Sequence, residues 1–396
     1  MRKVIAFSCL LVAGLAGSQL LPGLDAAVLP TVRDAIRLVT MTLLGFIMIH
    51  VGYEFEIDRN RLRSYAVDYG VAATAAAFPW IFCSLYFLLV LIPEGVIGRS
   101  EAWTQALLAG RFAAPTSAGI LFSMLAAGGL SATWLFRKAR ILAIFDDLDT
   151  VLLMIPLKML MVGVRWQLGV IVVIMAAQIW IAWRYLRRLH AAVTWPWVLG
   201  YAVAITAVSE AIYVSSKLVD DVVPIHVEVL LPAFVLGCLL ARPAGADPHA
   251  DDTREGHQEG PEGAREQRVS TVVSWAFMVF VGLSMPAIDP GASGTSWAAL
   301  AWHTAVVTVL ANLGKMFPLF CYRTEVDWRQ RLALCIGMWP RGEVVAGVLV
   351  LSLGYGIGGA MVTVATFSLA LNLVLTGIFI LVVKALLNAS ARAAPG

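Results

Sequence analysis

Long apolar segments separated by short polar connections run through almost the whole chain. Most are about 17–25 residues long and a few are longer, which is the length an α-helix needs to cross the hydrocarbon core of a bilayer. The pattern therefore predicts an all-α polytopic membrane protein. We expect about twelve membrane helices, at residues 4–22, 35–54, 66–92, 104–127, 141–163, 166–186, 195–216, 223–241, 270–288, 296–320, 331–353 and 359–387.

The first apolar segment, residues 4–22, has two interpretations. It follows Arg2 and Lys3, and a secretory signal also begins with basic residues and an apolar stretch. A cleavable signal commonly ends in a more polar stretch than the Gln-Leu-Leu-Pro of residues 19–22. We therefore favour a first membrane helix over a signal peptide.

The composition supports a membrane protein. Of the 396 residues, 60% are hydrophobic and only 14% are charged, which excludes a soluble globular domain of ordinary makeup. The net charge is +3, and the basic residues fall in short clusters between apolar segments, so we expect no nucleic-acid partner. The five cysteines show no Cys-x-x-Cys spacing, and we interpret them as small core residues.

The basic clusters predict the orientation of the helices. They occupy alternate connections, and membrane proteins place an excess of lysine and arginine on the cytoplasmic side. Both termini are therefore expected in the cytoplasm. The clusters are Arg59, Arg61 and Arg63; Arg137, Lys138 and Arg140; Arg184, Arg187 and Arg188; and Arg323, Arg329 and Arg331.

One hydrophilic stretch, residues 244–268, divides the chain into two parts. It is rich in Gly, Pro, Glu, Asp and His, which is typical of a disordered segment, and the same orientation makes it a charged cytoplasmic linker. We interpret its histidines as part of this tether rather than as metal ligands. Residues 1–243 then hold the first eight helices, and residues 269–396 hold the last four as a C-terminal repeat.

In two of the predicted helices, a proline near the middle is followed directly by hydroxyl or charged residues: Pro115, before Thr116 and Ser117, in residues 104–127, and Pro340, before Arg341, in residues 331–353. Proline removes a backbone donor, and unwound backbone at membrane depth survives only inside protein or beside a wet cavity. Ordinary kinks are the alternative interpretation. A pair of such breaks in the two halves of a chain, however, points to the binding site of a transporter.

The two broken helices run in opposite directions across the membrane by the orientation above, so we expect inverted-topology repeats. These repeats comprise the third to fifth helices and the tenth to twelfth. Their spacing agrees, because Asp147 lies 32 residues after Pro115 and Asn372 lies 32 residues after Pro340. The symmetry therefore places a polar residue, Asn372, at the position that matches an acidic one.

Three carboxylates lie within four residues of an apolar segment: Asp146, Asp147 and Asp149. Each acidic side chain at the centre of a membrane helix costs about 2.5–3.5 kcal/mol, so the group needs a compensating partner. Adjacent carboxylates can share a cation or hold protons, and switching between these states is transport chemistry. The alternative is a structural role, with the acids hydrogen-bonded inside the bundle.

Further charged residues lie near these features. Lys315 falls inside residues 296–320, where it either pairs with a carboxylate, for which Asp146 is the candidate, or extends to the inner surface. Arg341 and Glu343 adjoin the second proline and either pair with each other or line an ion path.

These residues resemble a known family. The Phe-Asp-Asp-Leu of residues 145–148, preceded by residues 113–124, is similar to the acidic pair and unwound helix of the bacterial Na+/H+ antiporters in the cation:proton antiporter superfamily. The similarity extends over most of the chain, to residues 280–285, Gly314-Lys315 and residues 338–343.

The resemblance implies a fold and a set of roles. The fold has inverted repeats and a core domain, with the fourth and eleventh helices crossed and unwound, that moves against a dimerisation domain. Asp147 is then the Na+ ligand beside Asp146, Asp146 can pair with Lys315, and an acidic pair implies electrogenic exchange. Many relatives have Thr-Asp at the crossing, whereas this chain has Thr116-Ser117, which leaves the selectivity among Na+, K+ and Li+ open.

We therefore expect a secondary transporter that exchanges Na+ or Li+ for H+ by alternating access. The resemblance places it in the bacterial inner membrane as a homodimer that serves pH homeostasis. Na+ and H+ are its substrates, no cofactor is expected, and the chain is not expected to be an enzyme. The supporting ion path is assigned to Thr116, Ser117, Asp149, Arg341, Glu343 and Asn372.

Other functions compete with this one. A K+/H+ antiporter, a channel or another cation-coupled carrier fits the same fold. A membrane prenyltransferase holds Mg2+ and diphosphate with aspartate-rich motifs, but it usually has two such motifs with wider spacing. An intramembrane aspartyl protease needs Gly-x-Gly-Asp and a second catalytic aspartate, which the sequence lacks.

Overall fold

The structure is a computed structural model, and it describes residues 2–25, 27–54, 62–92, 100–162, 166–219, 225, 227, 229–241, 264–285, 296–342, 345, 349 and 359–393. Within these residues the chain is built from helices, and its single β-type pairing is a bridge between Leu189 and Leu240. The all-α fold predicted from the apolar pattern is confirmed.

The chain divides into two compact units, each made of segments that are distant in the sequence. Unit 1 comprises Met1–Ile36, Asn60–Met161 and Met278–Gly396, and unit 2 comprises Arg37–Arg59 and Val162–Phe277.

The predicted linker at residues 244–268 lies mostly outside the described residues. Its last part belongs to a helix, α10 (Ala264–Leu283), so the helix begins before the predicted end of the linker.

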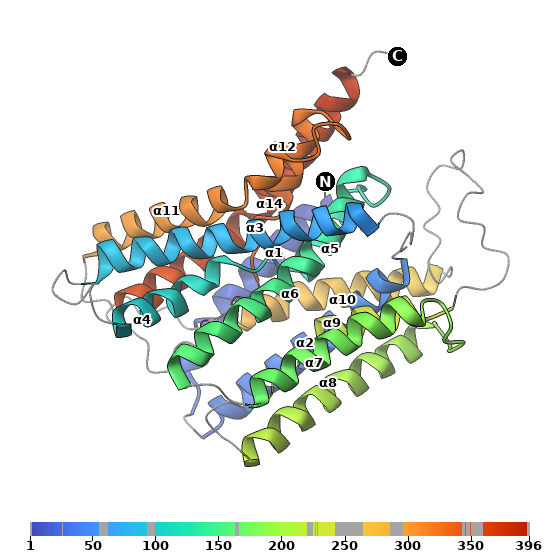
Figure 1. Ribbon diagram of the computed structural model, residues 1–396, viewed down its shortest axis with the longest axis horizontal. Coiled ribbons are helices and arrows are strands. Elements are labelled where there is room, and N and C mark those ends of the chain that lie inside the picture. The colour runs from blue at the N-terminus through green and yellow to red at the C-terminus, as the bar shows by residue number, and fades with distance from the viewer. Residues whose placement is uncertain are drawn as a thin grey trace. The chain divides into compact units, whose positions relative to one another are not determined.

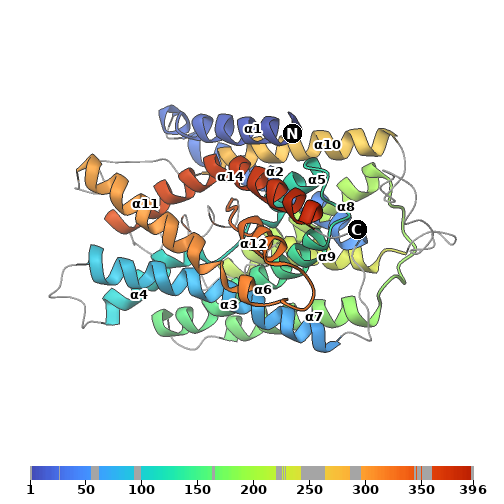
Figure 2. The same cartoon turned by 90° about the horizontal axis from the view of Figure 1, so that it is seen from above.

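Unit 1 carries Pro115, Pro340 and the three acids Asp146, Asp147 and Asp149. Its helices are α1 (Arg2–Ser18), α3 (Leu62–Tyr86), α4 (Ser100–Gly110), α5 (Ala118–Ala127), α6 (Trp134–Val162), α11 (Trp297–Gly314), α12 (Trp328–Gly337) and α14 (Ala360–Ala393). α12 and α14 lie side by side, and α11 packs against both α3 and α14 (Figures 1 and 2).

Among the described residues, 7 helices are long and apolar enough to cross a membrane. They occupy Val4–Gly23, Leu29–Tyr53, Arg63–Leu91, Trp166–Arg184, Trp195–Val219, Trp297–Phe320 and Ala360–Arg392. The other predicted spans hold helices that are short, interrupted or charged: α4 with α5, α6, α9 (Leu230–Leu239), α10 and α12. Every predicted span therefore contains a described helix, as expected of a polytopic membrane protein.

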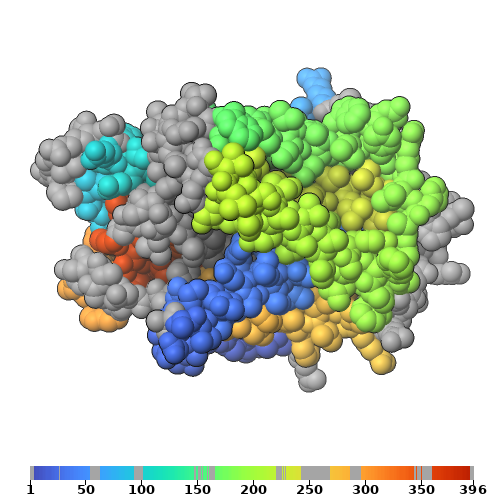
Figure 3. Space-filling view, turned by 90° about the horizontal axis from the view of Figure 1, so that it is seen from below, coloured from blue at the N-terminus to red at the C-terminus, as the bar shows by residue number. Residues whose placement is uncertain are grey.

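Unit 2 contains most of α2 (Leu29–Glu54), α7 (Trp166–Arg184), α8 (Trp195–Val219), α9 and most of α10. An ion pair of 2.7 Å between Arg37 Nη2 and Glu210 Oε1 joins α2 to α8. Large apolar side chains, among them Trp197, Val208 and Leu218, are exposed on α8, whose surface is seen in Figure 3. Such a surface suits contact with lipid.

Candidate functional site

Two helices of unit 1 are interrupted where the sequence places a proline. α4 ends at Gly110, a 3-10 turn covers Arg111–Ala113, and non-helical backbone continues to Ser117 before α5 begins. α12 ends at Gly337, and residues 338–342 are not helical. We call residues 111–117 the first break and residues 338–342 the second break. Both predicted interruptions are present.

The two breaks touch each other. The backbone N–H of Ser117 in the first break donates to the carbonyl of Pro340 in the second break, at 2.9 Å. The hydroxyl of Ser117 accepts from the N–H of Ile120 at 3.3 Å and so caps the N-terminus of α5. The breaks therefore cross in direct contact, and Ser117 supplies both the link and the cap.

Two side chains reinforce the crossing in a reciprocal way. The hydroxyl of Thr116 donates to the carbonyl of Met338 at 3.0 Å. In the other direction, the Arg341 guanidinium donates to the carbonyl of Ala113 from Nη2 at 3.1 Å and from Nε at 3.3 Å. Each donor directly follows the proline of its own break, so the two breaks satisfy each other's backbone carbonyls.

Asp146 and Lys315 form a buried ion pair beside the crossing. Both side chains are 0% exposed, and Lys315 Nζ lies 2.8 Å from each carboxylate oxygen of Asp146. Lys315 also donates to the carbonyl of Ala114 at 2.5 Å, and the N–H of Thr116 donates to Asp146 Oδ2 at 2.8 Å. The expected pairing is present, and complete burial rules out an extension of Lys315 to the surface.

Lys315 does not lie in the interior of its helix as the sequence suggested. α11 ends at Gly314, and Lys315 is the C-cap residue. A cation is favourable there because the helix C-terminus carries partial negative charge. A Cβ on Gly314 would overlap the backbone of Pro79 in α3, so this glycine allows the close approach that fixes the end of α11.

Arg341 is also buried, with 1% exposure, and it joins the second break to α11. Its Nη1 donates to Asn312 Oδ1 at 2.7 Å, and its Nη2 donates to the carbonyl of Ala311 at 2.8 Å. The alternative partner from the sequence, Glu343, lies outside the described residues. Arg341 therefore acts as a hub that ties both breaks to α11.

Asn372 of α14 reaches the same network. Its Nδ2 donates to Asn312 Oδ1 at 3.1 Å, so Asn312 accepts from both Arg341 and Asn372. Asn372 is buried, and its Oδ1 has no hydrogen-bond partner among the described residues. The residue predicted from repeat spacing therefore lies in the polar centre of unit 1, and none of the described residues donates to its side-chain oxygen.

The three acids of α6 differ in what they contact. Asp149 is 3% exposed, receives a hydrogen bond from the Tyr69 hydroxyl, and keeps Oδ2 without a partner among the described residues. Asp147 belongs to α6, but its side chain lies outside the described part of the structure. Among the side chains that are described, no group of three His, Cys, Asp or Glu is arranged to hold a metal ion.

Interrupted membrane helices that cross over a buried carboxylate and ammonium form a site suited to ions. The sequence model of the family described as "Sodium/hydrogen exchanger, transmembrane" matches residues 3–388, nearly the whole chain. The chain belongs to this family. A comparison with curated proteins found no match. The exchanger is a multi-pass membrane transporter, and its family carries out cation and proton antiport.

Sequence reasoning missed one member of the exchanger's central network. Asn312 accepts from both Arg341 and Asn372, but it was passed over as part of the apolar helix that leads to Lys315. An amide in an apolar segment, one helical turn before a buried lysine, is the signal that identifies it.

A second ion pair of the exchanger was also missed. Lys138 Nζ of α6 lies 2.9 Å from Asp68 Oδ1 of α3, and both side chains are nearly buried. The Tyr322 hydroxyl donates to the same carboxylate at 2.7 Å, and Lys138 lies 4.4 Å from the centre of the Tyr322 ring. Tyr322 has a φ of 54°, a conformation that is uncommon outside glycine. Asp68 is an acidic residue within the apolar segment of residues 66–92, and this position indicates that it has a buried partner.

Proposed function

We propose that the exchanger moves Na+ in exchange for H+ by alternating access and that the exchange is electrogenic. We assign it to a bacterial inner membrane and to a role in pH homeostasis. The observation that carries this proposal is the fully buried pair of Asp146 and Lys315 at the crossing of the two breaks. Asp147 follows Asp146 directly in α6 and is assigned as the Na+ ligand. Both termini are assigned to the cytoplasm.

Protons and the cation compete for the same carboxylates. With protons bound, Asp147 is neutral and the Lys315 ammonium balances Asp146, which is the pairing found at 2.8 Å. A cation that enters beside Asp147 and Asp146 replaces the ammonium, and Lys315 gives up its proton together with that of Asp147. Two protons then leave for each Na+ that binds, so each cycle moves one net charge.

The exchange is strict because a buried charge cannot be left alone. Removing one partner of a buried ion pair costs about 3–5 kcal/mol, so Lys315 leaves Asp146 only when another cation takes its place. The cation-binding and proton-binding states therefore exclude each other, which couples the two fluxes without a separate gate for each.

Unit 1 is assigned as the moving core domain, because it holds the crossing, the ion pair and the Arg341 network. Unit 2 is assigned as the domain that forms a homodimer. In this assignment Thr116, Ser117 and Arg341 keep the two breaks together as one body, and Asp149, Asn372 and Glu343 support the ion path.

A transport assay identifies the cation. The resemblance implies a carboxylate at the crossing where this chain has Ser117, which leaves the selectivity among Na+, Li+ and K+ open, so all three cations are tested. Purified protein in liposomes that contain a pH-sensitive dye receives NaCl, LiCl, KCl or choline chloride at several pH values. We expect proton movement with NaCl, and a potential-sensitive dye then reports the net charge of each cycle.

Asp147→Asn is the decisive variant, and Asp34→Asn, at an exposed position of α2, is its matched control. We expect Asp147→Asn to abolish cation-driven proton movement while Asp34→Asn leaves it unchanged. Normal exchange by Asp147→Asn would show that the assignment of the cation ligand is wrong. Proton movement with KCl and none with NaCl would change the cargo to K+.

A further inference from the structure

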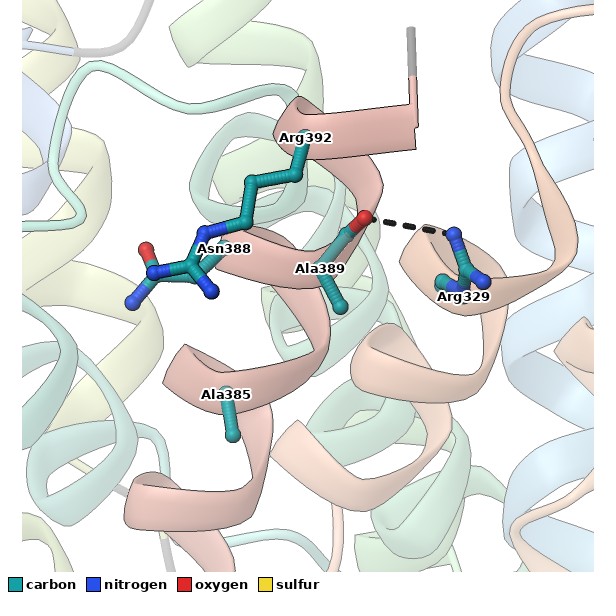
Figure 4. A pocket seen from close by; sticks show the side chains of 5 residues that line it. All are labelled: Arg329, Ala385, Asn388, Ala389 and Arg392. Carbon is teal, nitrogen blue, oxygen red and sulfur yellow. Dashed lines mark hydrogen bonds between the residues drawn. The ribbon is translucent and has the colours of Figure 1, made fainter.

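A surface cavity of about 450 Å3 lies between α12 and the last turns of α14. It is lined by Arg329 of α12 and by Ala385, Asn388, Ala389 and Arg392 of α14 (Figure 4). In Figure 4 the side chains of Arg329 and Arg392 lie on opposite sides of Ala389. The cavity is thus flanked by two guanidinium groups, with small side chains between them.

The lining of the cavity selects for negative charge. Among the described residues that line it are two arginines and one amide, and none of them is a carboxylate. Arg329 is oriented by one hydrogen bond, from Nη1 to the carbonyl of Ala389 at 3.2 Å, which leaves its other donors available. Arg392 makes no hydrogen bond to the described residues. Guanidinium groups match the oxygens of a phosphate, because their planar donors can bind two oxygens at once.

The surface beside the cavity is apolar and continues along α14. Val374, Ile378 and Val382 are 44%, 54% and 40% exposed. They share one helical face with Ala385 and Ala389, because residues three or four apart lie one above another on a helix. A soluble anion gains nothing from this face. An acyl chain does, so the combination favours a lipid over free phosphate.

The cavity lies at an end of α14 that extends beyond the hydrocarbon core. The apolar span that includes α14 is 33 residues long, which is about 50 Å of helix against a hydrocarbon core of about 30 Å, so its last turns extend beyond the core. Trp328 precedes Arg329, is 54% exposed, and lies 5.6 Å below the Arg329 guanidinium. Exposed tryptophan is typical of the membrane interface.

We propose that this cavity binds an anionic phospholipid, with its phosphate between Arg329 and Arg392 and one acyl chain along Val374, Ile378 and Val382. Asn388 donates its amide to the headgroup. Basic pockets between membrane helices on the cytoplasmic side are suited to such headgroups. The site lies on α14 and α12, away from the ion pair, and the proposal does not depend on which cation the exchanger carries.

The test measures lipid retention by native mass spectrometry of the purified full chain. The protein is incubated with phosphatidylglycerol or with phosphatidylcholine, which differ in net charge. The double variant Arg329→Gln/Arg392→Gln is compared with the wild type. Arg323→Gln, at an exposed position in the loop before α12, is the matched control. Arg392→Gln alone is included because it breaks no hydrogen bond to the described residues, so it is expected to fold.

We expect the wild type and Arg323→Gln to retain phosphatidylglycerol in preference to phosphatidylcholine. Each arginine near an anionic headgroup is worth about a fivefold change in affinity, so Arg392→Gln loses about fivefold and the double variant more. Equal retention by wild type and Arg392→Gln would overturn the proposal. A thermal unfolding measurement tests for a soluble ligand. If glycerol 3-phosphate raises the thermal midpoint of the protein as much as phosphatidylglycerol does, the cavity binds a soluble phosphate and the proposal is wrong.

Discussion

Thr116 and Arg341 each hold the helix break to which the other belongs. The Thr116 hydroxyl donates to the carbonyl of Met338, three residues before Arg341, and the Arg341 guanidinium donates to the carbonyl of Ala113, three residues before Thr116. The same offset in both directions is what a two-fold relation between the repeats produces. A threonine and an arginine can occupy equivalent positions of the two repeats, because each position requires only a side chain that donates to a carbonyl.

This reciprocity predicts unequal effects of substitution at the two positions. Arg341→Gln removes donors to Ala113, Ala311 and Asn312 and leaves buried acceptors unsatisfied, so we expect it to lower the free energy of unfolding by about 2–4 kcal/mol. Thr116→Val keeps the shape and loses one hydrogen bond, so we expect about 1 kcal/mol. Thermal unfolding in detergent measures both, with Arg323→Gln as the control. A larger loss for Thr116→Val would contradict the hub role of Arg341.

The buried pair of Asp146 and Lys315 predicts strong coupling between them. Asp146→Asn leaves an ammonium in the protein interior, and Lys315→Met leaves a carboxylate, so each single change is expected to destabilise the fold by about 3–5 kcal/mol. The double variant removes both charges and should lose less than the sum of the two. A double-mutant cycle on thermal unfolding measures this difference. Additive losses would show that the two side chains are not energetically paired.

The sequence predicted those parts of the site that depend on local chemistry. A proline alone does not interrupt an apolar helix, since α3 and α6 run continuously through Pro79 and Pro156. Pro115 and Pro340 were singled out because they form a pair of mid-span prolines in the two halves of the chain, and both lie in breaks. A charged side chain in an apolar segment must find a partner, and this led to the pairing of Asp146 with Lys315. Both inferences rest on the cost of an unsatisfied group in a membrane, which applies before the fold is known.

The rest depends on packing that the sequence does not show. Lys315 was expected within its helix, but α11 ends one residue earlier where Gly314 meets the backbone of Pro79, a contact between residues far apart in the chain. Asn312 was missed because its importance comes from two donors that approach from other helices. Single polar residues in apolar helices show that a partner exists, but they do not show which one.

Asn312 and Asn372 should therefore differ in their effect on stability. Asn312 Oδ1 accepts from Arg341 and from Asn372, so Asn312→Ala removes the acceptor of Asn372 Nδ2 and leaves Arg341 Nη1 with only the carbonyl of Trp339. We expect it to cost about 2–4 kcal/mol. Asn372→Ala removes one hydrogen bond and a buried oxygen that has no partner among the described residues, so we expect a smaller loss. Thermal unfolding of the two variants in the same detergent compares them. An equal or larger loss for Asn372→Ala would contradict this arrangement.

The second ion pair predicts a pH dependence at alkaline pH. Burial and the hydrogen bond to Asp68 raise the pKa of Tyr322 above the usual value of about 10. The folded state thus keeps Tyr322 protonated where the unfolded state ionises it, so its contribution to stability is complete below about pH 10 and is lost as the pH rises further. We expect the thermal midpoint of the wild type to fall more steeply between about pH 9.5 and 11 than that of Tyr322→Phe, in which Lys138 and Asp68 can still pair. Parallel curves for the two proteins would show that the Tyr322 hydroxyl does not respond to the charge of Asp68.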